Sequence, residues 1–122
     1  MQSVIQKKSL RSVKIFWLNA RKAIRILKKA AAEYAKDNSA VLKVVLFGSL
    51  AQGRAVPGSD ADILVVLKNS SKKFMDRISD ISSSFQKLDM GVEVFPYTID
   101  EIKKGIPIAN NALKNGITLW KR

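Results

Sequence analysis

Apolar residues recur every three or four positions from Ser12 to about Lys36, which is the period of one face of an α-helix. Many of the polar positions between them are Lys or Arg, so the opposite face is basic. The pattern predicts a long amphipathic helix over about residues 12–37, which stops at Asp37-Asn38-Ser39. We expect its aromatic residues to be core or interface residues because they belong to the apolar stripe, which comprises Val13, Phe16, Trp17, Ala20, Ile24, Leu27, Ala31 and Tyr34.

Two apolar runs in the middle of the chain predict buried strands, at Lys43 to Phe47 and at Asp60 to Leu67. Between them, Gly48 to Gly53 predicts a turn that opens a short helix. The segment Val56-Pro57-Gly58-Ser59 is typical of a type II turn, because Pro fixes φ and Gly accepts a positive φ. We expect this turn to return the chain to the sheet at Asp60.

The remainder of the chain alternates helical and extended patterns. Apolar residues keep helical spacing from Phe74 to about Leu88, and Val92 to Phe95 predicts a third strand that ends before Pro96. Three further elements are expected towards the end: short helices near Thr98 to Lys104 and Pro107 to Lys114, and an edge strand at Gly116 to Trp120.

These elements predict an α+β fold. We expect residues 1–122 to form one domain, with a mixed sheet of three or four strands, helices mainly on one face, and a long N-terminal amphipathic helix. The sequence contains no internal repeat or linker that would divide it. A functional site is expected at the open face and the strand ends.

The amino-acid composition excludes several kinds of catalytic and metal site. The chain has no Cys and no His, which excludes disulfides, zinc clusters, thiol catalysis and an imidazole base. Carboxylates, hydroxyls, backbone amides and Lys or Arg must therefore supply any reactivity. We find neither a signal peptide nor a run of about 20 apolar residues, so we expect a soluble, cytoplasmic protein with no membrane partner.

The net charge of +12 is uneven, because residues 1–40 contain ten Lys or Arg against two acids. A basic surface attracts polyanions and acidic proteins. Nucleic acid, nucleotide or an acidic protein are therefore candidate partners, although a solvated Lys-rich face explains the same charge. The apolar stripe of the predicted helix could also bury itself in a homo-oligomer.

Acidic residues at two predicted strands form a candidate metal site. Asp60 and Asp62 are two residues apart on an extended segment, so they project to the same side. Glu93 points away from the core side defined by Val92 and Val94, and it joins the two aspartates if the third strand lies beside the second. Gathered carboxylates repel one another unless a cation neutralises them, and Mg²⁺ or its substitute Mn²⁺ prefers oxygen ligands. Glu93 is also a candidate acceptor for the proton of an attacking hydroxyl.

A candidate phosphate site faces these acids. Gly48 permits close approach of the backbone, Ser49 offers a hydroxyl, and free N–H groups at the start of the following helix attract phosphate. Phosphate donors opposite bound cations suit phosphoryl or nucleotidyl transfer. The other acids are expected to be solvated helix positions or caps, namely Asp76, Asp80, Asp100 and Glu101.

The order Gly48-Ser49, then Asp60 and Asp62 before an apolar strand, then Glu93, resembles the nucleotidyltransferase superfamily of DNA polymerase beta. The resemblance covers about residues 43–97 and is greatest to the minimal nucleotidyltransferases that are often encoded beside a HEPN-domain protein. It implies that Asp60 and Asp62 bind two Mg²⁺, that Glu93 completes the first metal site, and that Gly48 and Ser49 hold the triphosphate of an NTP.

The resemblance further implies transfer of a nucleoside monophosphate, most plausibly AMP from ATP, to an acceptor hydroxyl. A HEPN-like partner in a toxin–antitoxin pair would supply that hydroxyl on a protein. Leu50 and Gln52 stand where many family members have Arg, and the nearest cation, Arg54, is a candidate phosphate ligand. The alternative is a binding module that keeps the fold without catalysis and uses its basic helix to hold a protein or nucleic acid.

Overall fold

The computed structural model describes residues 9–54 and 60–122, with the side chains described from residue 20 onwards. The side chains of Val13, Phe16 and Trp17 and the turn expected at residues 56–59 therefore lie outside the described part. The elements follow in the order α2 (Ser9–Lys36), β1 (Val41–Phe47), α3 (Gly48–Ala51), β2 (Ala61–Leu67), α4 (Phe74–Phe85), β3 (Val92–Thr98), α5 (Ile99–Lys103), α6 (Pro107–Asn115) and β4 (Ile117–Lys121).

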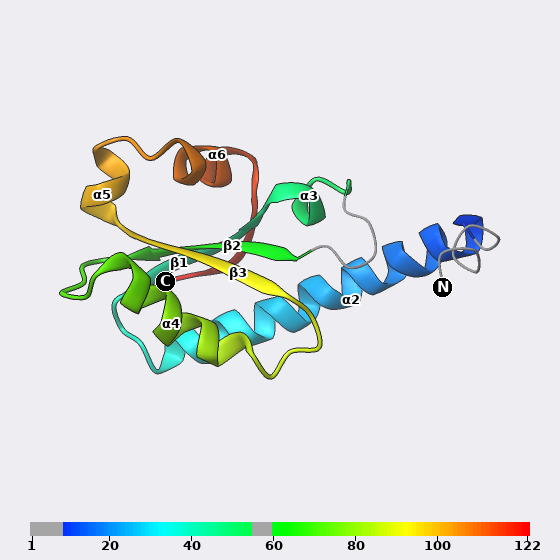
Figure 1. The fold of residues 1–122 in the computed structure, drawn as a ribbon, viewed down its shortest axis with the longest axis horizontal. Helices are drawn as coiled ribbons and strands as arrows, with labels where there is room; N and C mark the ends of the chain where they lie inside the picture. The colour runs from blue at the N-terminus through cyan, green and yellow to red at the C-terminus, as the bar shows by residue number, and fades with distance from the viewer. Residues whose placement is uncertain (1–8, 55–59) are drawn as a thin grey trace.

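A four-stranded mixed sheet with strand order β3-β2-β1-β4 forms the centre of the fold (Figure 1). β1 is antiparallel to both β2 and β4, whereas β2 and β3 are parallel and are joined through α4. Two strands therefore begin at the same end of the sheet, which is also the end where β1 leads into α3. This arrangement confirms the predicted α+β class.

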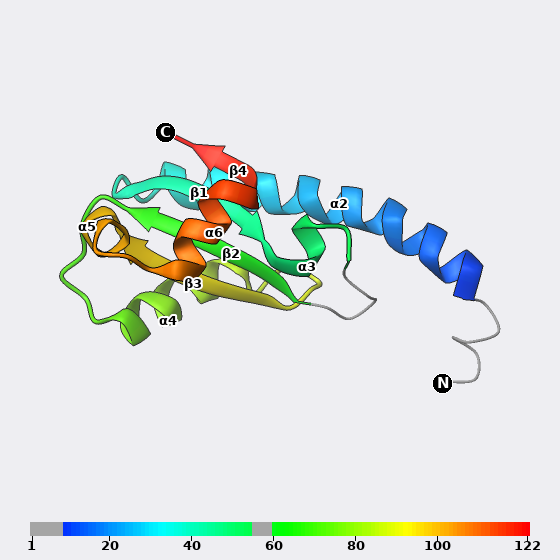
Figure 2. The same cartoon turned by 90° about the horizontal axis from the view of Figure 1, so that it is seen from above.

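One face of the sheet is covered by the two long helices, α2 and α4 (Figure 1). The helix face predicted from the apolar period is buried from residue 20 onwards, including Leu27 and Ala31, both fully buried. These side chains pack with Ile63 and Val65 of β2 and with Ile81 of α4. In Figure 2 the first turns of α2 extend past the end of the sheet that carries α3.

The other face is covered in part by the short helices α5 and α6, which lie on the side of the sheet opposite α2 and α4 in Figure 1. Ala109 and Ala112 of α6 are fully buried against Val45 of β1 and Leu64 of β2. The part of this face nearest α3 carries Asp62 and Glu93, which alternate with the core residues of their strands. The described helices include no segment with the length and apolarity needed to cross a membrane.

The third strand is longer than the sequence predicts. We expected it to end before Pro96, yet β3 continues through Pro96 to Thr98 and pairs with β2 along its length. β3 is an edge strand, and an edge tolerates proline because a residue without an N–H loses nothing when that group would point away from the sheet. The edge strand predicted near the C-terminus is confirmed as β4, which pairs with β1.

Candidate active site

The register of the parallel pair places two acidic side chains next to each other. Asp62 of β2 lies opposite Glu93 of β3, and Phe47 of β1 lies opposite Asp62 on its other side. Residues in register on neighbouring strands project to the same face of a sheet. Asp62 and Glu93 therefore form a carboxylate pair at the beginning of both parallel strands.

Electrostatic crowding marks this pair. The pKa of Asp62 is raised above its ordinary value, first by burial, then by a hydrogen bond with Glu93 and by the negative charges of Glu93 and Asp60. Each cause disfavours the charged carboxylate. Asp62 thus holds a proton more readily than an isolated aspartate would, and a bound cation would relieve the repulsion between the two side chains.

Two glycines make room for the aspartates. Gly48 has a φ of +78°, and a Cβ built on it would collide with the carboxylate oxygen Oδ2 of Asp62. A Cβ on Gly91 would collide in the same way with Oδ1 of Asp60. The backbone N–H of Ala61 donates to the carbonyl of Gly91 at 2.9 Å, which fixes Asp60 beside this glycine. Gly91 was not predicted as a site residue, because its only signal in the sequence is its position immediately before the third strand.

The Gly48-Ser49 turn is held by backbone hydrogen bonds. The N–H of Gln52 donates to the carbonyl of Gly48 at 3.1 Å, and the N–H of Arg54 donates to the carbonyl of Ser49 at 2.9 Å. Ser49 is half-buried, and Gln52 and Arg54 are exposed. The guanidinium of Arg54 donates to the side-chain oxygen of Gln52, so the structure brings Arg54 to this turn without directing it at the carboxylate pair.

An aromatic pair borders the carboxylates on the same face. The rings of Phe47 and Phe95 are edge to face, with centroids 5.2 Å apart. Phe47 is opposite Asp62 in the register, and Phe95 is two residues beyond Glu93. Both rings are half-buried, and they lie on the face of the sheet that carries the carboxylate pair. The alternation of the strands could have indicated Phe95, because it has the same parity as Glu93.

The donor set fits a hard divalent cation. Within the part of the chain that the structure describes, no three acidic side chains gather closely enough to form a ready-made metal site. Asp60 lies against Gly91 while Asp62 and Glu93 lie together, which leaves one carboxylate to be brought in. Carboxylate oxygens are the ligands that Mg²⁺ or Mn²⁺ prefers, and a bound cation would favour the charged form of Asp62, which its surroundings otherwise disfavour.

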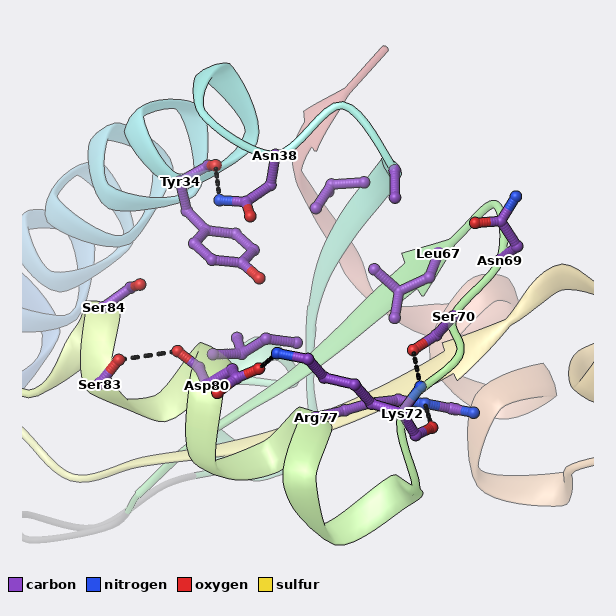
Figure 3. Close-up of a pocket in the computed structure, with 13 residues that line it drawn as sticks. Tyr34, Asn38, Leu67, Asn69, Ser70, Lys72, Arg77, Asp80, Ser83 and Ser84 are labelled. Carbon is purple, nitrogen blue, oxygen red and sulfur yellow. Dashed lines mark hydrogen bonds and ion pairs between the residues drawn. The ribbon is translucent and has the colours of Figure 1, made fainter.

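A polar cavity lies at the other end of the sheet and contains none of the predicted site residues. It has a volume of about 500 Å³ and lies between α2 and α4 (Figure 3). Burial raises the pKa of the Tyr34 phenol there, and the charge of Asp80 adds to this effect. Asp80 forms an ion pair with Lys72, and its backbone carbonyl accepts from Ser83 at 2.8 Å. Its acidic group is therefore already paired.

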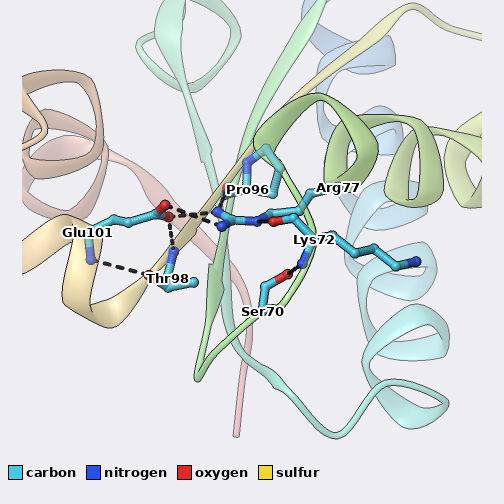
Figure 4. A network of polar contacts seen from close by, with 6 residues as sticks. All are labelled: Ser70, Lys72, Arg77, Pro96, Thr98 and Glu101. Carbon is cyan, nitrogen blue, oxygen red and sulfur yellow. Dashed lines mark hydrogen bonds and ion pairs between the residues drawn. The ribbon is translucent and has the colours of Figure 1, made fainter.

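A second charged group at this far end is fully satisfied (Figure 4). Arg77 of α4 donates from Nη1 to Oε1 of Glu101 at 2.7 Å, and from Nε to the carbonyl of Lys72 at 3.0 Å. Glu101 also closes a capping box with Thr98, which confirms that this acid is a cap. Its hydrogen bond with Arg77 is the main reason that the pKa of Glu101 is lowered.

Comparison with known proteins agrees with this geometry. The family model described as "Polymerase beta, Nucleotidyltransferase" matches residues 29–122. The chain is 41% identical over 51 residues to "Putative protein adenylyltransferase MJ1305" of Methanocaldococcus jannaschii, a match that covers 42% of this chain. It spans only 33% of that relative.

Solved structures show the same fold. A "putative nucleotidyltransferase" from Sulfolobus solfataricus superposes with a TM-score of 0.64 and 24% identity, over 86% of each chain. A toxin–antitoxin structure with AMP-PNP superposes with a TM-score of 0.54 and 19% identity, over 78% of this chain and 73% of the other. Because the family model covers most of the sequence and every predicted site residue, the chain belongs to the polymerase beta nucleotidyltransferase family.

Proposed function

We propose that residues 1–122 form a single nucleotidyltransferase domain that transfers a nucleoside monophosphate, AMP from ATP, to an acceptor hydroxyl in the cytoplasm. The observation that carries the proposal is the Asp62–Glu93 pair in a chain of this family. Asp62 lies against Gly48 and is two residues after Asp60.

Each site residue has a role in this proposal. Asp60, Asp62 and Glu93 would hold Mg²⁺, or Mn²⁺ in its place, which requires Asp60 to turn from Gly91 towards the other two. The bound cation would neutralise charge on the triphosphate and on the leaving pyrophosphate. Gly48 and Ser49 hold the phosphates through the backbone and a hydroxyl.

The transfer requires a group that accepts the proton of the acceptor hydroxyl and cations that balance the charge of the phosphates. The acceptor oxygen bonds to the α-phosphorus, the bond from that phosphorus to the bridging oxygen of pyrophosphate breaks, and Glu93 takes the hydroxyl proton. Arg54 would leave Gln52 and approach the phosphates, supplying the cation that Leu50 and Gln52 do not provide. Phe47 and Phe95 limit the access of water, which would otherwise compete with the acceptor.

Similar proteins support a protein acceptor. The archaeal relative is described as a protein adenylyltransferase, and the superposed toxin–antitoxin structure contains AMP-PNP. We therefore propose that ATP is the donor and that a hydroxyl on a HEPN-like partner in a toxin–antitoxin pair is the acceptor. This partner assignment rests on those descriptions and on the shared fold.

The test is release of pyrophosphate from labelled NTPs with Mg²⁺, in the presence and absence of the neighbouring gene's product. The wild type should release pyrophosphate from ATP and label the partner, whereas Asp60→Ala/Asp62→Ala should not. Asp37→Ala/Asp89→Ala is the matched control, because it removes two exposed acids elsewhere. No release by the wild type under any of these conditions would overturn the proposal.

That negative outcome would favour the second candidate, a binding module. The exposed basic face of α2, which includes Arg21, Lys22, Arg25, Lys28 and Lys29, is the observation in its favour. Binding of nucleic acid to this face should weaken steeply between low and moderate salt, because each phosphate contact releases counterions. A flat salt response would exclude nucleic acid as its ligand.

A further inference from the structure

An apolar groove crosses the face of the sheet beneath α5 and α6. Its volume is about 370 Å³, and its exposed lining is almost entirely apolar. Leu42 of β1 and Val66 of β2 come from the strands, Ile102 comes from α5, and Leu113 comes from α6. Leu113 is 37% exposed, which leaves apolar surface open beside the groove. Figure 2 shows the two helices above these strands.

Positive charges surround this groove. Lys43 of β1, Lys103 of α5 and Lys121 of β4 line it together with Arg122, and no acidic residue lines it among those that the structure describes. None of the three lysines forms an ion pair with another described residue. These lysines can therefore bind the carboxylates of a partner without first breaking an ion pair with a described residue.

Arg122 differs from the three lysines because it is fixed in place. Its Nε donates to the carbonyl of Val41 at 2.8 Å, and its Nη2 donates to the carbonyl of Ala35 at 2.9 Å. Its guanidinium carbon lies 4.7 Å from the centroid of the Trp120 ring. The Arg122 charge is therefore held against the C-terminal end of α2, which leaves the three lysines as the unpaired charges at the groove among the described residues.

The groove is distinct from the carboxylate pair. Val66 lies four residues after Asp62 on the same strand, a separation of about 13 Å at roughly 3.3 Å per residue. None of the residues proposed for catalysis lines the groove. A ligand in the groove can therefore be bound without reaching the catalytic end of the sheet.

We propose that this groove is the docking site for an acidic amphipathic segment of a partner protein. The segment inserts one or two large apolar side chains between α5 and α6 and sets its carboxylates against Lys43, Lys103 and Lys121. The small volume suits a few anchoring side chains, and the surrounding lysines select negative charge. The net charge of +12 disfavours a second copy of this chain as the occupant. This proposal does not depend on the catalytic function.

The probe for this site is a fluorescent helical peptide of 16 residues with Leu at every third or fourth position and Glu elsewhere. The matched probe has Gln in place of each Glu. The Glu peptide should bind the wild type more tightly than the Gln peptide, as measured by anisotropy. Amide shifts in nuclear magnetic resonance should change around Leu42, Val66 and Ile102 and remain constant at Asp62.

Substitutions at the groove distinguish binding in the groove from attraction to the overall positive charge of the protein. Lys103→Glu/Lys121→Glu should weaken binding by about tenfold, since two exposed pairs become repulsive. Leu113→Asp should weaken it by at least about tenfold through loss of an apolar contact. Lys28→Glu/Lys29→Glu makes the same charge change on the exposed face of α2 and should leave binding unchanged. Circular dichroism melting would confirm that all variants fold.

Three results would overturn the proposal. An equal loss in the α2 variant would show that the peptide follows net charge alone. Equal affinity for the Glu and Gln peptides would remove the role of the lysines. A dimer in sedimentation experiments that Leu113→Asp converts to monomer would show that a second copy fills the groove.

Discussion

The two ends of the parallel strands β2 and β3 hold charges in opposite ways. At their beginning, Asp62 and Glu93 are like charges in register, and the pKa of Asp62 is raised. At the other end, Arg77 and Glu101 are opposite charges joined by two hydrogen bonds, and the pKa of Glu101 is lowered. The Asp62–Glu93 pair therefore destabilises the folded state at one end of the sheet, and the Arg77–Glu101 pair stabilises it at the other.

This difference separates the requirements of function from those of stability. Like carboxylates that are crowded and partly buried cost free energy in the folded state, and proteins retain such groups chiefly where they act. The Arg77–Glu101 group leaves no buried side-chain polar atom unsatisfied among the described residues. It joins α4, β3 and α5, and its groups are all engaged in holding the fold.

The largest effect is expected from Asp62→Asn, which removes one like charge. Nucleotidyl transfer should fall by more than about 100-fold, since even residues behind metal ligands contribute 10–100-fold. The unfolding free energy in EDTA should nevertheless rise, by about 0.5–2 kcal/mol, as at other strained active sites. Pyrophosphate release and urea titration measure the two effects. Asp89→Asn, an exposed change, should alter neither. If Asp62→Asn is less stable than the wild type, the Asp62–Glu93 pair does not destabilise the fold.

Arg77→Met tests the other end. Arg77 is 8% exposed, and its removal leaves Glu101 and the carbonyl of Pro96 without their partner. We expect the unfolding free energy to fall by about 3 kcal/mol and the melting temperature by about 10 °C. Lys87→Met breaks the exposed pair with Glu33 and should change stability by less than about 0.5 kcal/mol. Similar losses in both variants would show that the Arg77–Glu101 pair stabilises the fold no more than the exposed Lys87–Glu33 pair does.

Gly48→Ala tests the end of the sheet that carries Asp62 and Glu93. Gly48 and Gly105 both have positive φ, at +78° and +100°, so alanine should cost roughly 1–2 kcal/mol at either position. Only at Gly48 does the added Cβ meet Asp62; at Gly105 it meets nothing within 4 Å. We therefore expect Gly48→Ala alone to reduce pyrophosphate release. Equal activity of the two variants would show that Asp62 needs no room at this position.

The smallest effects are expected in the pH dependence of stability in EDTA. Between the ordinary and raised pKa of Asp62, the native state binds a proton that the unfolded state lacks, so stability falls as pH rises. Glu101 has the opposite sign: its contribution is present at neutral pH and is lost as pH falls below the ordinary value towards its lowered pKa.

Each group contributes a slope of at most about 1.4 kcal/mol per pH unit. Urea titrations from pH 3 to pH 8 should show that Asp62→Asn removes the loss on raising pH and that Glu101→Gln removes the loss on lowering it. Slopes unchanged by both substitutions would mean that other groups control acid stability.

Periodicity predicted much of the fold. The stripe containing Leu27 and Ala31 predicted the buried face of α2, because a helix that packs on a sheet must be apolar with a period near 3.6 residues. The alternation around Glu93 predicted that it projects opposite to Val94, and the structure places it beside Asp62. The roles of these acids, and of Gly48, Ser49 and Arg54, remain predictions.

Contacts between segments that are distant in the chain could not be predicted from the sequence. Arg77 and Glu101 are 24 residues apart, and neither position shows a local signal for their contact. Glu101 was predicted only as a solvated position or cap, because its contact with Arg77 depends on where α4 lies against β3. The groove under α5 and α6 likewise depends on how the last two helices pack.

Pro96 has a consequence for how this protein behaves at high concentration. In an extended strand, the nitrogen and the carbonyl of one residue point to the same side, and the Pro96 carbonyl accepts a hydrogen bond from Arg77 at 3.3 Å. The outer border of β3 therefore has, at this position, no hydrogen to donate and an acceptor that is already engaged. A strand from another molecule that tried to extend the sheet there would meet a gap in its ladder, and this protects the border against amyloid-like stacking.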